Sequence, residues 1–282
     1  MTSRLNIGGL SMVLEGHDSL ATALQLPGMN LFADQSGAEP RLMVRLDADV
    51  PLPDCRWLHR FTVADDVECR FGVDARGDYY YHFSGHGTLR AATGGRKPDA
   101  FSISPIASPS VLRFALWTAY SMGGLWLGRL PVHSSVVVCD GRAVMCLGES
   151  GTGKSTHTRL WLQHIAATHL LNDDSPILAD DGTVYGSPWS GKTHCYRNEH
   201  FPVAAIVRLE QRPENRIRPL GTVEAFTALQ PSCPPCLMKD DTLQDALVDY
   251  VGHVIERVPV YRLGCLPDAE AARLCHTTIF KS

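Results

Sequence analysis

The chain has 282 residues, of which 44% are hydrophobic and 20% charged, and its formal net charge is −4. This composition is typical of a folded globular protein that buries a substantial core. The small negative charge argues against nucleic acid and against a membrane surface as partners, because both attract strongly basic proteins.

The cysteines and the N-terminus bear on the cellular compartment. There are nine cysteines, an odd number without the regular spacing of a disulfide framework. Met1 is not followed by a basic and then an apolar stretch, so we expect no signal peptide. Together these features predict a protein of the reducing cytoplasm.

Residues 1–105 predict a mostly β region made of short strands and turns. Leu42–Leu46 is an apolar run of strand length, and Val67–Val73 and Tyr79–Phe83 read as two strands around a turn. No constellation of reactive side chains is visible in this region. We interpret it as a separate part of the chain that contributes to substrate recognition.

Residues 106–282 predict a second, α/β domain. It begins with an apolar helix at Pro109–Leu127, which is too short and too interrupted by glycine to cross a bilayer comfortably. Two continuous apolar runs around a turn predict buried strands. The expected strands are 134–139, 143–147, 170–171, 203–209 and 258–263, and the expected further helices are 154–165, 242–257 and 269–275.

The strongest motif lies between the second buried strand of this domain and the helix that follows. It matches G-x-x-x-x-G-K-[ST], the P-loop, at every fixed position. Such a loop turns backbone N–H groups toward phosphate oxygens at a helix N-terminus, which favours negative charge. The lysine would contact the β- and γ-phosphates of ATP, and the serine would bind Mg²⁺. The residues predicted to bind the nucleotide are Gly148, Glu149, Ser150, Gly151, Thr152, Gly153, Lys154, Ser155 and Thr156.

A pair of acids follows the next predicted strand. Asp173 and Asp174 come directly after Asn172, about twenty residues beyond the P-loop. Two adjacent carboxylates can divide the work of a kinase, one binding the metal and the other accepting the proton of the incoming hydroxyl. The alternative is that the pair only caps a turn before Pro176, a position that aspartate favours.

Two further features accompany these motifs. His133 precedes the first strand of the domain, where it could orient a reacting group. The segment Trp189–Arg197 contains Gly191, Lys192 and Arg197, and it predicts a mobile loop whose cations close over the phosphates. The alternative for this segment is a solvated connection.

The order of these parts resembles the HPr kinase/phosphorylase family and, more distantly, ATP-dependent phosphoenolpyruvate carboxykinase. The resemblance covers residues 130–210 and comprises a histidine that opens a strand, a hairpin, Gly-x-Ser-Gly-x-Gly-Lys-Ser and a strand that ends in Asp-Asp. The chain departs from the family at Thr156, where an acid is usual, and it lacks the later Arg-Gly-x-Gly stretch. The chain therefore resembles a divergent branch, some of whose members phosphorylate a serine of a peptide.

The resemblance implies a mixed sheet of the HPr kinase/carboxykinase type and a set of catalytic roles. Asp173 would be the base, Asp174 and Ser155 would bind the metal, and Lys154 and Arg197 would neutralise the charge on the transferring group. His133 would orient the acceptor or a phosphate oxygen. Since HPr kinases form rings, the resemblance also implies a homo-oligomer.

We therefore expect an ATP- and Mg²⁺-dependent kinase that transfers the γ-phosphoryl group to a hydroxyl, with serine as the favoured acceptor. The acceptor would belong to a protein, a peptide or a small molecule, and nothing in the sequence selects among them. An ATPase or nucleotide-switched binding module without an acceptor is the alternative. Both readings share the same P-loop and the same Asp pair.

Overall fold

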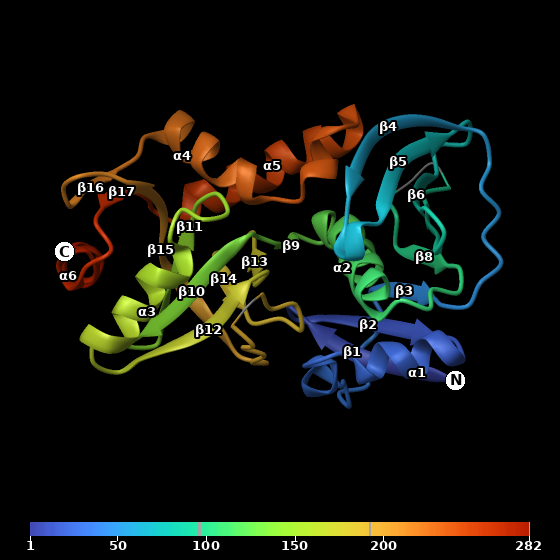
Figure 1. The fold of residues 1–282 in the computed structure, drawn as a ribbon, viewed down its shortest axis with the longest axis horizontal. Helices are drawn as coiled ribbons and strands as arrows, with labels where there is room; N and C mark the ends of the chain where they lie inside the picture. Colours follow the sequence, from blue (N-terminus) through green and yellow to red (C-terminus); the bar gives the residue numbers. More distant parts are fainter. Residues whose placement is uncertain (95–96, 192, 282) are drawn as a thin grey trace. The chain divides into compact units, whose positions relative to one another are not determined.

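The structure, a computed structural model, describes residues 1–94, 97–191 and 193–281. The chain forms two compact units, each built on one mixed sheet (Figure 1). The first unit comprises Met1–Leu127 and Cys236–Ala246, and the second comprises Gly128–Pro235 and Leu247–Ser282. The chain is therefore of the mixed α/β class, as the sequence predicts.

The sheet of the first unit has the strand order β1-β2-β3-β8-β7-β6-β5-β4. The contacts β2–β3 and β3–β8 are parallel and the others are antiparallel. The strands are β1 (Thr2–Ile7), β2 (Leu10–Glu15), β3 (Leu42–Arg45), β4 (Cys55–Thr62), β5 (Glu68–Asp74), β6 (Tyr79–Phe83), β7 (Gly87–Ala92) and β8 (Ala100–Ile103). The predicted strands at 42–46, 67–73 and 79–83 are thus confirmed.

Helices α1 (Asp18–Gln25) and α2 (Pro109–Leu125) accompany this sheet, with short 3-10 turns at Met29–Phe32 and Ala64–Asp66. Ser108 begins α2 as its N-cap, because its hydroxyl accepts a hydrogen bond from the N–H of Val111. The helix packs closely on the sheet at Gly123, where a Cβ atom would lie 2.3 Å from Leu42 Cδ2. The apolar segment predicted to be a buried helix is therefore the helix that covers this sheet. No helix in the described parts of the chain is long and apolar enough to cross a membrane.

The boundary between the units differs from the one expected at residue 105. Since α2 packs on β3, β7 and β8, it belongs to the first unit, and the boundary lies after Leu127. The first unit also includes Cys236–Ala246, which returns to it from far along the chain. There the hydroxyl of Tyr79 donates a hydrogen bond of 2.8 Å to Asp240 Oδ1.

The second unit contains a sheet with the order β12-β10-β11-β15-β14-β13-β9, and β17 pairs with both β15 and β16. Its strands are β9 (Arg129–Pro131), β10 (Ser134–Cys139), β11 (Arg142–Leu147), β12 (Thr168–Asp174), β13 (Ile177–Ala179), β14 (Thr183–Tyr185), β15 (His200–Gln211), β16 (Arg216–Pro219) and β17 (Val260–Cys265). Its helices are α3 (Lys154–His164), α4 (Thr222–Leu229) and α6 (Ala269–Phe280), together with most of α5 (Asp241–Arg257), and a short 3-10 turn lies at Gln230–Ser232. A further 3-10 turn, Pro235–Met238, lies at the point where the chain returns to the first unit.

The main core of this unit lies between the sheet and the helices α3 and α6, which contact each other. Alternate residues of the strands, such as Val207, Leu209 and Leu263, are buried in this core with Trp161 of α3. Side chains between them, such as Arg208 and Arg262, therefore belong to the opposite face of the sheet, because successive residues of a strand alternate.

Candidate functional site

The segment predicted to be a P-loop connects the carboxyl end of β11 to the first residue of α3. Strands β10 and β11 form an antiparallel hairpin whose continuous apolar run is buried, as predicted from its composition. The backbone then turns through Gly151 (φ +83°) and Gly153 (φ +108°), conformations that favour glycine. Gly153 is the N-cap of α3, so the loop presents the free N–H groups of a helix N-terminus.

Lys154 is the first residue of α3 and is 9% exposed. Its Nζ donates hydrogen bonds to the carbonyl oxygens of Gly148 (2.8 Å) and Glu149 (3.2 Å), and it lies 2.9 Å from His133 Nε2. Burial lowers the pKa of Lys154 and the nearby charge of Arg208 acts in the same direction, whereas Asp174 and Asp173 oppose the shift. The ammonium group is thus held at the mouth of the loop by carbonyl groups that an incoming phosphate can replace.

Ser155 lies beside one acid of the Asp pair. Its hydroxyl donates a hydrogen bond of 2.9 Å to Asp173 Oδ1. Asp173 is 7% exposed and pairs in register with Ser135 of β10, on the face that α3 covers. A serine hydroxyl beside a carboxylate supplies the hard oxygen ligands that Mg²⁺ prefers. These two residues therefore fit a magnesium ion.

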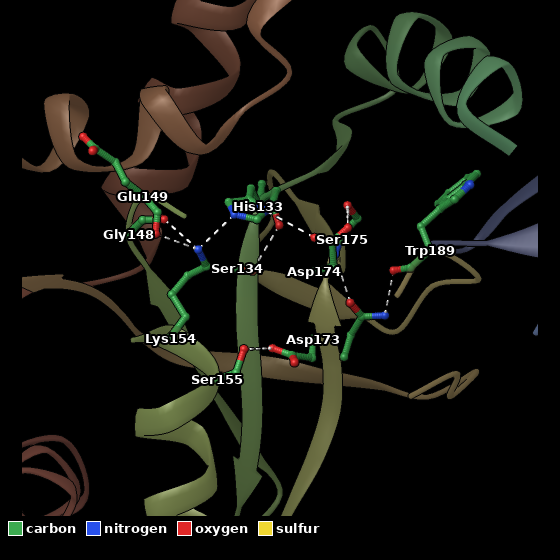
Figure 2. Close-up of polar contacts among 12 residues, drawn as sticks. His133, Ser134, Gly148, Glu149, Lys154, Ser155, Asp173, Asp174, Ser175 and Trp189 are labelled. Atoms are coloured by element: carbon green, nitrogen blue, oxygen red, sulfur yellow. Dashed lines mark hydrogen bonds and ion pairs between the residues drawn. The ribbon is translucent and has the colours of Figure 1, made fainter. Parts of the chain in front are cut away.

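His133 lies between Lys154 and the second acid of the pair (Figure 2). Its Nδ1 is 3.4 Å from Asp174 Oδ1. The ammonium group of Lys154 can only donate, so it favours the tautomer in which His133 Nε2 accepts and the Nδ1 proton is directed toward Asp174. Asp174 is more exposed than Asp173, and its Oδ2 accepts a hydrogen bond of 2.9 Å from Ser175 Oγ.

Asn172 fixes the end of β12 from within the core. Its side chain is fully buried, and Nδ2 donates to the carbonyl oxygen of Trp189 (3.2 Å) and lies 3.3 Å from Ser187 Oγ. Its Oδ1 accepts a hydrogen bond of 3.1 Å from the N–H of Ser175. The side chain therefore ties the residues after β14 to the strand that ends in the two acids.

Gly191 continues this attachment. Its N–H donates a hydrogen bond of 2.8 Å to the carbonyl oxygen of Asp173, and Ser190 forms a bridge with Asp174. A Cβ atom on Gly191 would lie 2.9 Å from that same carbonyl oxygen, so only glycine fits here without displacement. The first half of the segment predicted to be a mobile loop is thus bonded to β12.

Arg197, in the second half of that segment, does not join the cluster. Its Nη1 forms an ion pair of 3.3 Å with Glu199, and its charge acts on Cys195, whose Sγ lies against the carbonyl groups of Leu170 and Leu171. This places Cys195, two residues before Arg197, beside Leu170 and Leu171 of β12, which precede Asp173 by three and two residues. The other predicted cation, Lys192, lies outside the described residues.

Arg208 is a cation that the sequence analysis did not select. It lies on β15, in register with Leu147 immediately before the P-loop, and its side chain is 17% exposed. Its Nη2 is 3.9 Å from Glu149 Oε1, a distant contact to a side chain that is 87% exposed. The alternation of Arg208 with buried Val207 and Leu209 is the sequence signal that distinguishes it.

Comparisons with known proteins add little to this geometry. No protein family and no curated protein matches the sequence. Among solved structures, the HPr(Ser) kinase/phosphatase from Coxiella burnetii matches with 13% sequence identity and a TM-score of 0.27, over 53% of this chain and 93% of that chain. This is a distant structural similarity, and the chemistry of the site therefore rests on its own residues.

Proposed function

We propose that the chain binds ATP with Mg²⁺ and transfers the γ-phosphoryl group to a hydroxyl of an acceptor, with serine favoured. The observation that carries this proposal is the convergence of Lys154, Ser155, Asp173, Asp174 and His133 around the N-terminus of α3. A chance glycine-rich turn would not require a buried lysine, a histidine and two acids at the same point.

The transfer itself demands positioning and neutralisation of charge more than covalent help. The acceptor oxygen forms a bond to the γ-phosphorus, the bond to the bridging oxygen breaks, and ADP leaves with that electron pair. Mg²⁺, when bound, neutralises charge on the phosphate oxygens. Lys154 contributes a fixed positive charge at the mouth of the loop, and Arg208 supplies a second one from the neighbouring strand.

The two contacts of the Asp pair favour a definite division of roles. Since Asp173 holds the hydroxyl of Ser155, we assign it to the metal side of the site. Asp174 is more accessible and is held by His133, so we assign it the proton of the acceptor hydroxyl. This division is the reverse of the one that the family resemblance implies.

The experiment that tests this function is incubation of the purified protein with γ-labelled ATP, Mg²⁺ and a lysate of the source cells. We expect label on an acceptor that is absent when Lys154→Ala replaces the wild-type protein or when Mg²⁺ is chelated. If label is released only as inorganic phosphate whatever is added, the protein is an ATPase or a nucleotide-switched module. That result would overturn the kinase proposal.

A further inference from the structure

A mixed cluster of metal-binding side chains lies at the turn between β10 and β11, at the end of this hairpin that is opposite to the predicted P-loop. It consists of Cys139, Asp140 and His276. The Sγ, a carboxylate oxygen and a ring nitrogen of these residues all lie within 4.8 Å of one another. In the parts of the chain that the structure describes, no other group of three histidine, cysteine or acidic side chains comes this close. All three residues belong to the second unit, and none takes part in the proposed kinase site.

The backbone fixes two of these side chains in one tight turn. Asp140 (φ +49°) and Gly141 (φ +70°) both have left-handed backbone conformations. On either side of them, Cys139 pairs with Arg142 across the hairpin. Two consecutive left-handed residues make the two-residue turn that suits the twist of a β-hairpin, and aspartate tolerates this conformation better than most residues do. The thiol and the carboxylate therefore start from a well-defined backbone.

The third side chain comes from α6, far along the sequence. The ring centroid of His276 lies 5.6 Å from that of Trp161 of α3 and 5.1 Å from that of Phe280. These two rings hold the half-buried imidazole in place through its faces and edges. Among the described residues, neither ring nitrogen of His276 has a hydrogen-bond or ion-pair partner. Its nitrogens are thus available to a ligand while the ring itself is held by packing.

The cluster combines a buried soft ligand with an accessible hard one. Cys139 is 2% exposed and its Sγ lies 3.8 Å from the carbonyl oxygen of Ala166, whereas Asp140 is exposed. An ion can therefore reach the carboxylate from solvent and pass from there to the thiol. Thiolate, imidazole and carboxylate are all ligands of Zn²⁺, which binds four of them in a tetrahedron at about 2.0–2.3 Å. Ligand atoms in such a tetrahedron lie about 3.5 Å apart, so the cluster has only to contract, and a water molecule supplies the fourth ligand.

We infer that Cys139, Asp140 and His276 form a zinc site that fastens α6 to the β10–β11 hairpin. Coordination releases the proton of the Cys139 thiol to solvent and leaves two negative ligands that balance the charge of the ion. Since α3 and α6 enclose the main core of the second unit against its sheet, the ion holds the last helix over that core. The inference goes beyond the proposed function, because it concerns neither ATP nor the acceptor.

The test is a titration of the metal-free full chain with Co²⁺, which occupies zinc sites and reports its ligands by absorption. A thiolate ligand gives a charge-transfer band in the near ultraviolet. Binding at Ser155 and Asp173 gives no such band, because neither side chain contains sulfur. The principal variant is Asp140→Asn, since asparagine also tolerates a left-handed backbone. Asp66→Asn is the matched control, because Asp66 is likewise an exposed aspartate with a left-handed backbone (φ +57°).

We expect the charge-transfer band in the wild-type protein and in Asp66→Asn, and Zn²⁺ should abolish it by displacing Co²⁺. Asp140→Asn and His276→Gln should each weaken Co²⁺ binding at least about tenfold, and Cys139→Ser should remove the band. Circular dichroism establishes that the variants fold, and Asp140→Asn decides the matter if Cys139→Ser does not. Absence of the band from the wild-type protein would overturn the zinc site. So would a band of unchanged affinity in Asp140→Asn, which would assign the metal to other thiols of the chain.

Discussion

The helix that carries the P-loop contains a buried histidine that should make the protein sensitive to acid. His157 of α3 is 3% exposed, and its Nε2 accepts a hydrogen bond of 3.1 Å from the indole N–H of Trp161. Its Nδ1 is buried and has no hydrogen-bond partner among the described residues. Protonation would therefore place a charge in the core and set two donors against each other. Burial lowers the pKa of His157 from 6.5 to about 4.

The sign and the size of the effect follow from this shift. Because the folded-state pKa lies below the unfolded one, the unfolded chain binds more protons between pH 6.5 and about 4. The contribution of neutral His157 to the free energy of unfolding is fully present above that window and is lost as the pH falls through it. The shift in its pKa corresponds to about 3 kcal/mol of unfolding free energy, of which about 2 kcal/mol is lost by about pH 5.

The assay is urea unfolding at about pH 7 and about pH 5 for the wild-type protein and His157→Gln. Glutamine keeps an acceptor for Trp161 and does not titrate, so the variant should lose about 2 kcal/mol less than the wild-type protein between the two conditions. His164→Gln, an exposed histidine of the same helix, should behave as the wild-type protein does. Equal losses in His157→Gln and the wild-type protein would refute the reasoning.

Three further predictions test the proposed site. Lys154→Ala should abolish nucleotide-dependent activity while circular dichroism remains native, and unchanged ATP affinity would remove the phosphate-site assignment. Asp173→Asn should weaken Mg²⁺-dependent ATP binding, measured by calorimetry, by about tenfold or more. Asp174→Asn should retain that binding and slow single-turnover phosphoryl transfer by about 10²–10⁴. The opposite pattern would restore the roles that the family resemblance implies. Arg208→Gln should slow transfer by at least about tenfold with little effect on folding, and Arg197→Gln should not; comparable losses in both would show that Arg197 reaches the site.

Local features of the fold were predictable because each depends on a short stretch of chain. The hairpin of β10 and β11 shows a continuous apolar run around Asp140-Gly141, and the P-loop requires only its own residues and their place between strand and helix. The helix α2 was predicted from its own apolar run. Its place in the first unit was not predicted, because an apolar helix does not indicate which sheet it covers.

The missing parts of the prediction depend on contacts between distant residues. The return of Cys236–Ala246 to the first unit is fixed by partners such as Tyr79, far away in the sequence. The neighbours Asp173 and Asp174 point to opposite faces of β12, so the register against β10 decides which of them meets Ser155. No spacing in the sequence contains that information.

The buried amide of Asn172 has a consequence for any attempt to exchange the segment that follows β14. It holds Ser187 and Trp189, and its Nδ2 also lies 3.5 Å from the carbonyl oxygen of Cys195, within the segment 193–199, whose described side chains are mostly exposed. A graft that keeps Cys195 and replaces only residues 197–199 should preserve the geometry of the acids. A graft that extends back to Ser187 would remove the hydroxyl that Asn172 Nδ2 contacts and disturb the same strand end that carries the acids. The useful crossover point for chimaeras therefore lies after Cys195.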